Sequence, residues 1–211
     1  MILPLKSMNL VYATRSNLPS QTANSVQSAH MADAWARLCP GAHIIYRTGC
    51  FEQGSVAHFA PYEIAPPSGA RPLSLWPLDE LHHFYLLRFA WMLRRLSADS
   101  IVYTRSTRMA CMAVNAERVT VLELHDPLIA IRVAFLKKAF RSGKMQVLVV
   151  TTERLKRDVI EAVGLSPENI LVVGGGAAAA YSDVSASALS DRSRYALHVG
   201  YAGSALKGKG V

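Results

Sequence analysis

Three ionisable side chains follow one another closely at the end of an apolar run. The segment Val119 to Pro127 reads Val-Thr-Val-Leu-Glu-Leu-His-Asp-Pro. Its first half is typical of a strand buried on both faces of a parallel sheet, and Pro127 cannot continue a strand ladder. Ligands of open α/β sheets bind outside the carboxyl ends of the strands, so Glu123, His125 and Asp126 are placed to bind or act on one. The alternative is a simple strand end at which Asp126 caps the next helix.

Arg105 also follows a predicted strand and has two interpretations. Its guanidinium could form a buried ion pair with Glu123 at a neighbouring strand end, which would make that carboxylate structural. It could instead face an anionic acceptor, in which case both residues would belong to a substrate-binding site. The sequence leaves both possibilities open.

The sequence does not indicate a metal site. His82 and His83 stand near two acidic residues, but neighbouring residues on a helix point to different faces, so we interpret this segment as a solvated helix start. The cysteines form no C-x-x-C pair and have no histidine at ligand spacing; they are Cys39, Cys50 and Cys111. We therefore expect no metal and no cofactor, and a reducing cytoplasm as the compartment.

The elements that must position these side chains alternate regularly. Apolar β-branched runs predict strands at 8–13, 43–47, 100–104, 119–124, 145–151 and 170–173. Amphipathic runs predict a helix that Asn24 or Ser25 caps and that runs to 38, and further helices at 79–96, 107–115, 128–141 and 153–163. Thr152 is expected to cap the last of them, and Gly164 to end it in the C′ position. Residues 49–77 show no sustained period and are expected to be an irregular excursion. This alternation predicts an α/β fold with a Rossmann-like, doubly wound parallel sheet.

Composition sets further bounds on the protein. The chain has 211 residues, 51% of them hydrophobic, and a formal net charge of +8, which favours anionic partners. The amino terminus lacks the apolar core of a signal peptide, and no apolar run is long enough to span a bilayer. We expect one domain over 1–180, a linker over 181–194, and the first strand and Gly/Lys loop of a second domain over 195–211.

A set of motifs, taken in order, carries a family resemblance. They are Pro19-Ser20-Gln21-Thr22-Ala23-Asn24-Ser25, Tyr103-Thr104-Arg105-Ser106, Glu123-Leu124-His125-Asp126-Pro127, Val149-Val150-Thr151-Thr152, and Val199-Gly200-Tyr201-Ala202-Gly203-Ser204 with Lys209-Gly210. Together they resemble the amino-terminal half of a GT-B glycosyltransferase of family 4. The resemblance runs over nearly the whole chain.

The resemblance implies two facing Rossmann-like domains, with the acceptor bound mainly by the amino-terminal one and a nucleotide-sugar donor mainly by the other. Transfer would retain the anomeric configuration, and the acceptor would be a saccharide or lipid-linked. His125 would lie at the cleft near the transferred sugar, while Asn24 and Ser25 would border the acceptor or the donor phosphates. Gly203 and Lys209 would belong to the donor phosphate-binding loop, where a cation stabilises the charge of the leaving nucleoside diphosphate.

The chain departs from the family pattern at three places. Gly174 to Ala178 replaces the usual Pro-Asn/Asp-Gly-Val-Asp turn, and Ser204 stands where relatives commonly have an arginine. The two donor-binding glutamates of similar enzymes have no counterpart in these 211 residues. We therefore expect this polypeptide alone to be inactive.

Two basic helices suggest a possible surface. Their charged and aromatic residues are Arg88, Trp91, Arg94, Arg95, Arg132, Phe135, Lys137, Lys138, Phe140 and Arg141. Such faces can lie on an anionic membrane, and they can equally be solvated. A non-catalytic Rossmann-like module that binds anionic partners is the alternative function. No nucleic-acid-binding motif is present, so nucleic acid is not expected as a partner.

Overall fold

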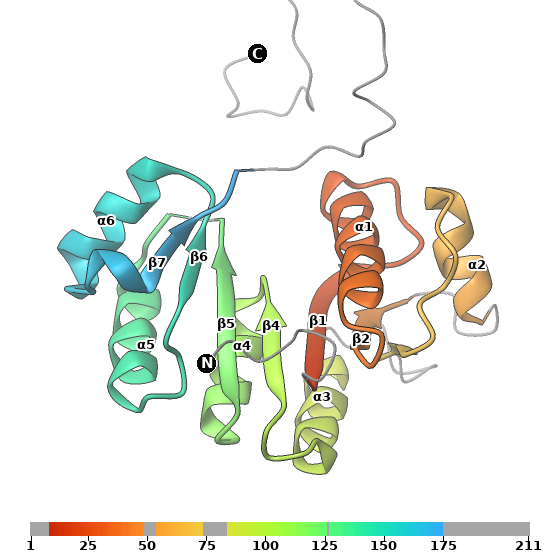
Figure 1. Ribbon diagram of the computed structural model, residues 1–211, viewed down its shortest axis with the longest axis horizontal. Coiled ribbons are helices and arrows are strands. Elements are labelled where there is room, and N and C mark those ends of the chain that lie inside the picture. The colour runs from red at the N-terminus through yellow and green to blue at the C-terminus, as the bar shows by residue number, and fades with distance from the viewer. Residues whose placement is uncertain (1–8, 49–53, 74–83, 126, 175–211) are drawn as a thin grey trace, which may run out of the picture. The chain divides into compact units, whose positions relative to one another are not determined.

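The computed structural model describes residues 9–48, 54–73, 84–125 and 127–174. Within them, seven parallel strands form one sheet in the order β3-β2-β1-β4-β5-β6-β7 (Figure 1). The strands are β1 (Leu10–Asn17), β2 (His43–Arg47), β3 (Ala70–Pro72), β4 (Ile101–Thr104), β5 (Val119–Leu124), β6 (Leu148–Val150) and β7 (Ile170–Val172). The chain builds outward from β1 to β3, returns to β4 and builds outward to β7. The predicted Rossmann-like, doubly wound parallel sheet is confirmed.

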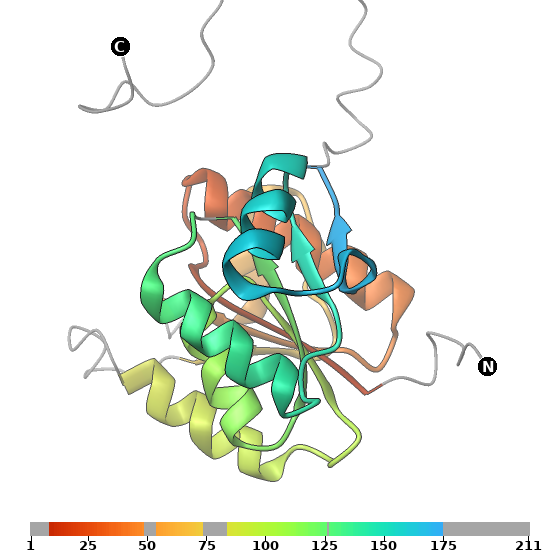
Figure 2. The same ribbon diagram turned by 90° about the vertical axis from the view of Figure 1, so that its left-hand side faces the viewer.

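Six α-helices cover the two faces of this sheet (Figure 2). The first face carries α1 (Ala23–Leu38) and α2 (Ser55–Phe59), whose side chains pack with Tyr12 and Tyr46 of the strands. The second face carries α3 (Phe84–Arg95), α4 (Thr107–Asn115), α5 (Ala130–Arg141) and α6 (Glu153–Val163). Two short 3-10 turns, Ala60–Tyr62 and Pro167–Asn169, complete the described elements. The two layers of helices bury the central strands on both faces, while Leu171 of the edge strand β7 stays 52% exposed.

Alternation of side chains explains why the central strands are apolar throughout. In β1, Tyr12 packs into the α1 layer, while Val11 and Ala13 pack into the α3 and α4 layer. All three are fully buried, as expected for a strand covered on both faces. Burial ends abruptly at Arg15, which is exposed. The polar end of β1 therefore emerges at the carboxyl edge of the sheet.

Helix ends follow local capping chemistry, with two corrections. Thr152 accepts a hydrogen bond from the Leu155 amide before α6, and Gly164 ends that helix in the left-handed region, both as predicted. The cap of α1 is Thr22, not Asn24 or Ser25, because its hydroxyl is the one that accepts from the Ser25 amide. The N-cap residue of α5 is Ile129, so the alternative in which Asp126 caps that helix is wrong. Asp126 itself lies outside the described residues.

The stretch predicted to be irregular, 49–77, contains α2 and the edge strand β3. Three residues carry too little periodicity to predict a strand, and β3 exists because it pairs with β2, Ile44 lying opposite Ala70. A Cβ on Gly69 would lie 2.3 Å from the Ala42 carbonyl oxygen, so only glycine permits this approach. The predicted strand over 145–151 is shorter in the structure, Leu148–Val150, and the helix expected from 128 begins at Ala130.

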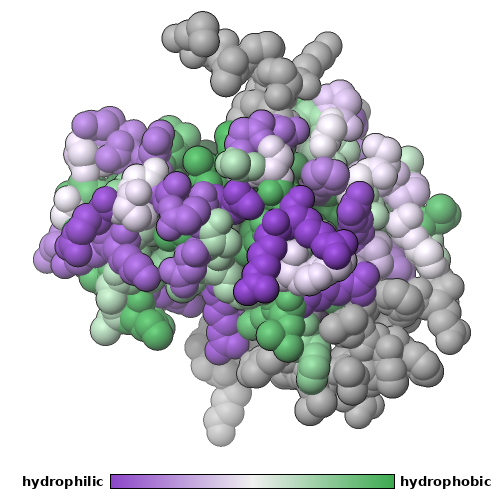
Figure 3. Space-filling model, turned by 90° about the horizontal axis from the view of Figure 1, so that it is seen from below, coloured by the Kyte–Doolittle hydropathy of each residue, from purple (hydrophilic) through white to green (hydrophobic). Residues whose placement is uncertain are grey.

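The chain divides into two compact units, Met1–Gly175 and Gly176–Val211. The expected linker over 181–194 and the strand and loop over 195–211, with Gly203 and Lys209, lie outside the described residues. Within the described part, no helix is both long and apolar enough to cross a membrane. The face shown in Figure 3 is mainly hydrophilic, with separate hydrophobic patches.

Candidate functional site

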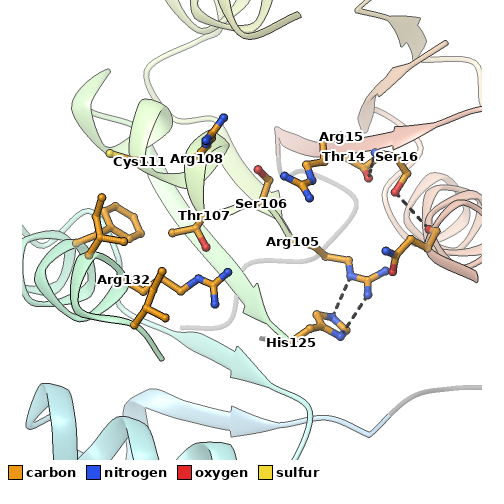
Figure 4. Close-up of a pocket in the computed structure, with 14 residues that line it drawn as sticks. Thr14, Arg15, Ser16, Arg105, Ser106, Thr107, Arg108, Cys111, His125 and Arg132 are labelled. Carbon is orange, nitrogen blue, oxygen red and sulfur yellow. Dashed lines mark hydrogen bonds between the residues drawn. The ribbon is translucent and has the colours of Figure 1, made fainter. Parts of the chain in front are cut away.

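A cavity of about 600 Å³ lies at the carboxyl edge of the sheet, where the order of strands reverses between β1 and β4. Parallel strands of this topology leave a crevice at that point, because the connections on either side run to opposite faces. Three strand ends contribute side chains to it: Thr14 to Ser16 near the end of β1, Arg105 to Arg108 after β4, and His125 after β5. Asn24, Cys111, Ile129, Ile131, Arg132 and Phe135 complete the lining (Figure 4).

His125 and Glu123 form the centre of a hydrogen-bonded cluster beside this cavity. His125 Nε2 lies 2.5 Å from Glu123 Oε1, and the Tyr103 hydroxyl donates to Glu123 Oε2 at 2.6 Å. Arg105 runs alongside the imidazole, with its Nε 2.9 Å from Nε2 and its Nη2 3.2 Å from Nδ1 (Figure 4). Arg105 Nε also lies 3.7 Å from Glu123 Oε1. The ion pair expected between Arg105 and Glu123 is therefore present.

One arrangement of the imidazole proton suits the short contact with Glu123, and in it Nε2 cannot also accept from Arg105 Nε, which lies 2.9 Å away. A proton on Nε2 can be donated to the Glu123 carboxylate, which has no proton of its own to offer when ionised. Nδ1 then carries a lone pair that accepts from Nη2 of Arg105. The carboxylate and the guanidinium together fix the ring in one orientation. Among the described residues, no hydrogen bond involves Nη1 of Arg105, so these two N–H donors remain for a ligand.

The cluster keeps Glu123 ionised although it is buried. Burial by itself would raise the pKa of Glu123, but hydrogen bonds from His125 and Tyr103 oppose it. The charge that His125 carries when protonated and the charge of Arg105 act in the same direction, and the net effect is a pKa lowered from 4.5. Burial, followed by the hydrogen bond to Glu123, raises the pKa of Tyr103, so the phenol stays protonated and remains a donor.

Exposure separates the residues that meet a ligand from those that support them. The side chain of Glu123 is 9% exposed and that of Arg105 13%, whereas His125 is 28% exposed. Glu123 is not among the residues that line the cavity, while Arg105 and His125 are. The structure thus brings Arg105, Glu123 and His125 together, with Glu123 behind the other two.

A second hollow, of about 410 Å³, adjoins the first and shares Arg15, Ser16, Asn24 and Arg108 with it. Asn24 is exposed and lines both, and its carbonyl accepts a hydrogen bond from the Ser16 hydroxyl at 3.3 Å. Ser25 is buried, shares a hydrogen bond with the Thr22 hydroxyl and lines only the second hollow. Of the two predicted residues, Asn24 therefore lies at the main cavity and Ser25 beside it.

Three arginines of the main cavity were not among the predicted site residues: Arg15, Arg108 and Arg132. The signal for Arg15 was its place at the polar end of β1, and the signal for Arg108 was its place in the first turn of the helix that follows β4. These signals have meaning only when β1 and β4 are known to be neighbours, which their separation in the sequence hides. Arg132, which the sequence places on a possible membrane face, donates from its Nη1 to the Pro127 carbonyl at 2.6 Å beside the cavity. No three His, Cys, Asp or Glu residues of the described ranges could together hold a metal ion.

Comparison with known proteins gives a likeness of fold. No protein-family model and no curated protein matches this chain. Among solved structures, a glycosyltransferase from Rickettsia africae is similar, with a TM-score of 0.50 and 13% sequence identity over 87% of this chain and 48% of the other. The lipopolysaccharide outer core galactosyltransferase WaaB gives a TM-score of 0.46 and 13% identity over 81% of this chain and 46% of the other. The chain spans about half the length of each of these proteins.

Proposed function

We propose that this chain is the acceptor-side lobe of a GT-B glycosyltransferase of family 4, which transfers a sugar from a nucleotide sugar to an acceptor with retention of configuration. The observation that carries the proposal is the polar cavity at the strand reversal, organised around His125. The similar fold of the Rickettsia glycosyltransferase supports the same assignment. A saccharide or lipid-linked compound is the proposed acceptor.

The chemistry of the cavity suits a sugar. Saccharides present many hydroxyl groups, and the cavity offers hydrogen-bonding partners from Arg105, Ser16, Asn24 and Thr107. Its volume of about 600 Å³ lies within the usual range for small-molecule sites. Both ring nitrogens of His125 are engaged within the protein, by Glu123 and Arg105. We therefore assign the ring of His125 the task of holding a sugar hydroxyl once Arg105 turns to the ligand.

The donor side of the proposal rests on the sequence motif alone. Gly203 and Lys209 are proposed to bind the donor phosphates, where a cation would stabilise the leaving nucleoside diphosphate. No metal or other cofactor is required by this proposal, since cationic side chains supply the charge.

Peripheral contact with an anionic membrane is part of the proposal. The outer face of α3 exposes Leu87 and Trp91, at 63% and 50%. Arg94 and Arg95 beside them are exposed, and the Arg95 guanidinium stacks over the Trp91 ring at 3.5 Å. Aromatic and basic side chains together favour the interface of an anionic bilayer. This face would bring the protein to a lipid-linked acceptor.

Sugar transfer can be tested on the protein purified from the whole reading frame that encodes this chain. The release of nucleoside diphosphate is measured with a panel of nucleotide sugars, with and without a panel of saccharide and lipid-linked acceptors. We expect acceptor-dependent release with one class of nucleotide. Absence of release with every donor would contradict the proposal and favour a non-catalytic binding module.

A further inference from the structure

Positive charge gathers on the walls of the two adjoining hollows. Their lining residues in the described ranges include five arginines and no aspartate or glutamate: Arg15, Arg47, Arg105, Arg108 and Arg132. Like charges that share one hollow repel one another, and an anion in their midst would relieve the repulsion. A neutral sugar would not.

Of these five arginines, Arg15 and Arg108 are the two whose side chains the fold itself does not use. Both are exposed, and neither makes a hydrogen bond or ion pair with any other described residue. Arg105, by contrast, is held by His125 and Glu123, and presents the two N–H donors of Nη1 and the second N–H of Nη2. Guanidinium groups bind phosphate oxygens by paired N–H donors, so these three side chains suit a phosphate group.

The start of α4 adds donors to the same wall. The Ser106 hydroxyl caps the helix by accepting from the Met109 amide, and Ala110 bonds to the Ser106 carbonyl. The amides of Thr107 and Arg108 have no partner among the described residues, and the first turn contains no acidic residue. Unpaired amides at a helix start favour an anion, in agreement with the arginines.

The wall formed by α5 has the opposite character. Ile129 and Ile131 line the main cavity and are 53% and 74% exposed, with Phe135 one turn further on. An ion alone would leave these apolar side chains in water. A phosphate ester with a carbon skeleton would cover them while its phosphate meets the arginines.

We infer that the acceptor is a phosphate ester, whose phosphate binds Arg15, Arg105 and Arg108 and whose carbon skeleton lies toward Ile129 and Ile131. This inference rests on the proposed function, because it specifies the acceptor of that transfer. The ester could be a lipid phosphate or a sugar phosphate, since both offer the same group to the arginines.

Binding is measured by calorimetry on the full chain without any nucleotide sugar. The ligands are n-octyl phosphate, glucose 1-phosphate, inorganic phosphate and the neutral n-octyl glucoside. We expect at least one ester to bind more tightly than inorganic phosphate, and the neutral glucoside to bind at least about tenfold more weakly than octyl phosphate. Preference for octyl phosphate would identify a lipid phosphate, and preference for glucose 1-phosphate a sugar phosphate.

Arg108→Gln and Arg154→Gln form a matched pair of variants. Both arginines are exposed and stand second in their helices, α4 and α6, but only Arg108 lines the hollows. Arg108→Gln should weaken ester binding about tenfold, and the double variant with Arg15→Gln further, while Arg154→Gln should not change it.

Three results would overturn the inference. They are equal weakening by Arg108→Gln and Arg154→Gln, inorganic phosphate binding as tightly as both esters, and displacement of the ester by a nucleoside diphosphate that binds more tightly through Arg108. The last result would assign the arginines to the donor. The binding assay contains no nucleotide sugar, so its result does not depend on whether the protein transfers a sugar. Failure of the separate transfer assay would count against the proposed function alone.

Discussion

His125 Nε2 lies 2.5 Å from Glu123 Oε1 at the point where β5 ends and the cavity begins. Glu123 still lies in the strand and faces the protein interior, whereas His125 is two residues further on and lines the cavity. The last buried carboxylate of the sheet thus orients the first side chain that a ligand meets. Tyr103 of the neighbouring strand β4 donates to the other carboxylate oxygen, Oε2, and Arg105, the residue after β4, forms an ion pair with Oε1.

The lowered pKa of Glu123 predicts an acid-sensitive contribution to stability. A carboxylate whose pKa is lower in the folded than in the unfolded state stabilises the fold above the unfolded value, here 4.5, and loses this contribution as the pH falls through the folded value. Glu123→Gln should lower the free energy of unfolding at pH 7 by about 3 kcal/mol, because Arg105 loses its buried partner. Urea unfolding between pH 7 and pH 3 should show this deficit shrinking below pH 4.5.

Glu161→Gln is the control for that experiment, because Glu161 is exposed on α6 and makes no ion pair with a described residue. It should change the free energy of unfolding by less than about 0.5 kcal/mol at every pH. A deficit in Glu123→Gln that stays constant down to pH 3 would show that the carboxylate is not held ionised.

The hydrogen bond from the Tyr103 hydroxyl is predicted to stabilise the ionised form of Glu123. Tyr103→Phe keeps the ring contacts with Tyr12 and Trp35 but removes the donor to Glu123 Oε2. We expect the free energy of unfolding to fall by about 2 kcal/mol and the pKa of Glu123 to rise, the latter measured by NMR on its carboxyl carbon. Tyr46→Phe removes a comparable buried hydrogen bond, to His58, at a distance from the cluster. An equal shift of the Glu123 signal in both variants would contradict a direct effect.

Close backbone approach at Gly69 is predicted to be essential for the edge strand β3. In Gly69→Ala the new methyl group would meet the Ala42 carbonyl, and the hydrogen bond from the Ile44 amide to the Gly69 carbonyl would be strained. Chemical denaturation should show that the free energy of unfolding falls by about 2 kcal/mol. Gly41 lies two residues before His43, and a Cβ there would meet no atom within 4 Å, so Gly41→Ala should lower the free energy of unfolding much less. Equal stability of the two variants would show that the register of β2 and β3 is not fixed there.

Membrane contact through α3 predicts a salt-dependent association with vesicles. Cosedimentation with vesicles that contain anionic lipid should decrease as salt is added, because screening weakens the attraction of Arg94 and Arg95. Trp91→Ser should reduce the bound fraction further, while Leu171→Ser, an exposed apolar residue on β7, should not. Binding that does not respond to salt, or that is lost equally in both variants, would argue against this face.

The sequence predicted the central elements well because their causes are local. β5, α4 and α6 have the predicted bounds, since an apolar run, a capping hydroxyl or a closing glycine defines each of them. β3 could not be predicted, because three residues become a strand only through pairing with β2. Whether such a short segment forms a strand depends on its pairing with a strand elsewhere in the sequence.

The candidate site divides in the same way. Glu123, Arg105 and His125 were predictable because one strand end carries two of them and the third could be recognised as a partner. Arg15 and Arg108 were missed because only the adjacency of β1 and β4 brings residues 14–16 to residues 105–108. Adjacency of strands is a property of the sheet order, which no short segment of sequence contains.

The most direct test of the central claim is kcat/KM for the acceptor in the transfer reaction, measured for the whole protein and its His125→Ala variant. His30→Ala, a half-buried histidine of α1 that lines neither hollow, is the control. Loss of the group that holds the reacting sugar should lower kcat/KM about 100-fold in His125→Ala and leave His30→Ala unchanged. Equal kcat/KM in wild type and His125→Ala would show that sugar transfer takes place elsewhere.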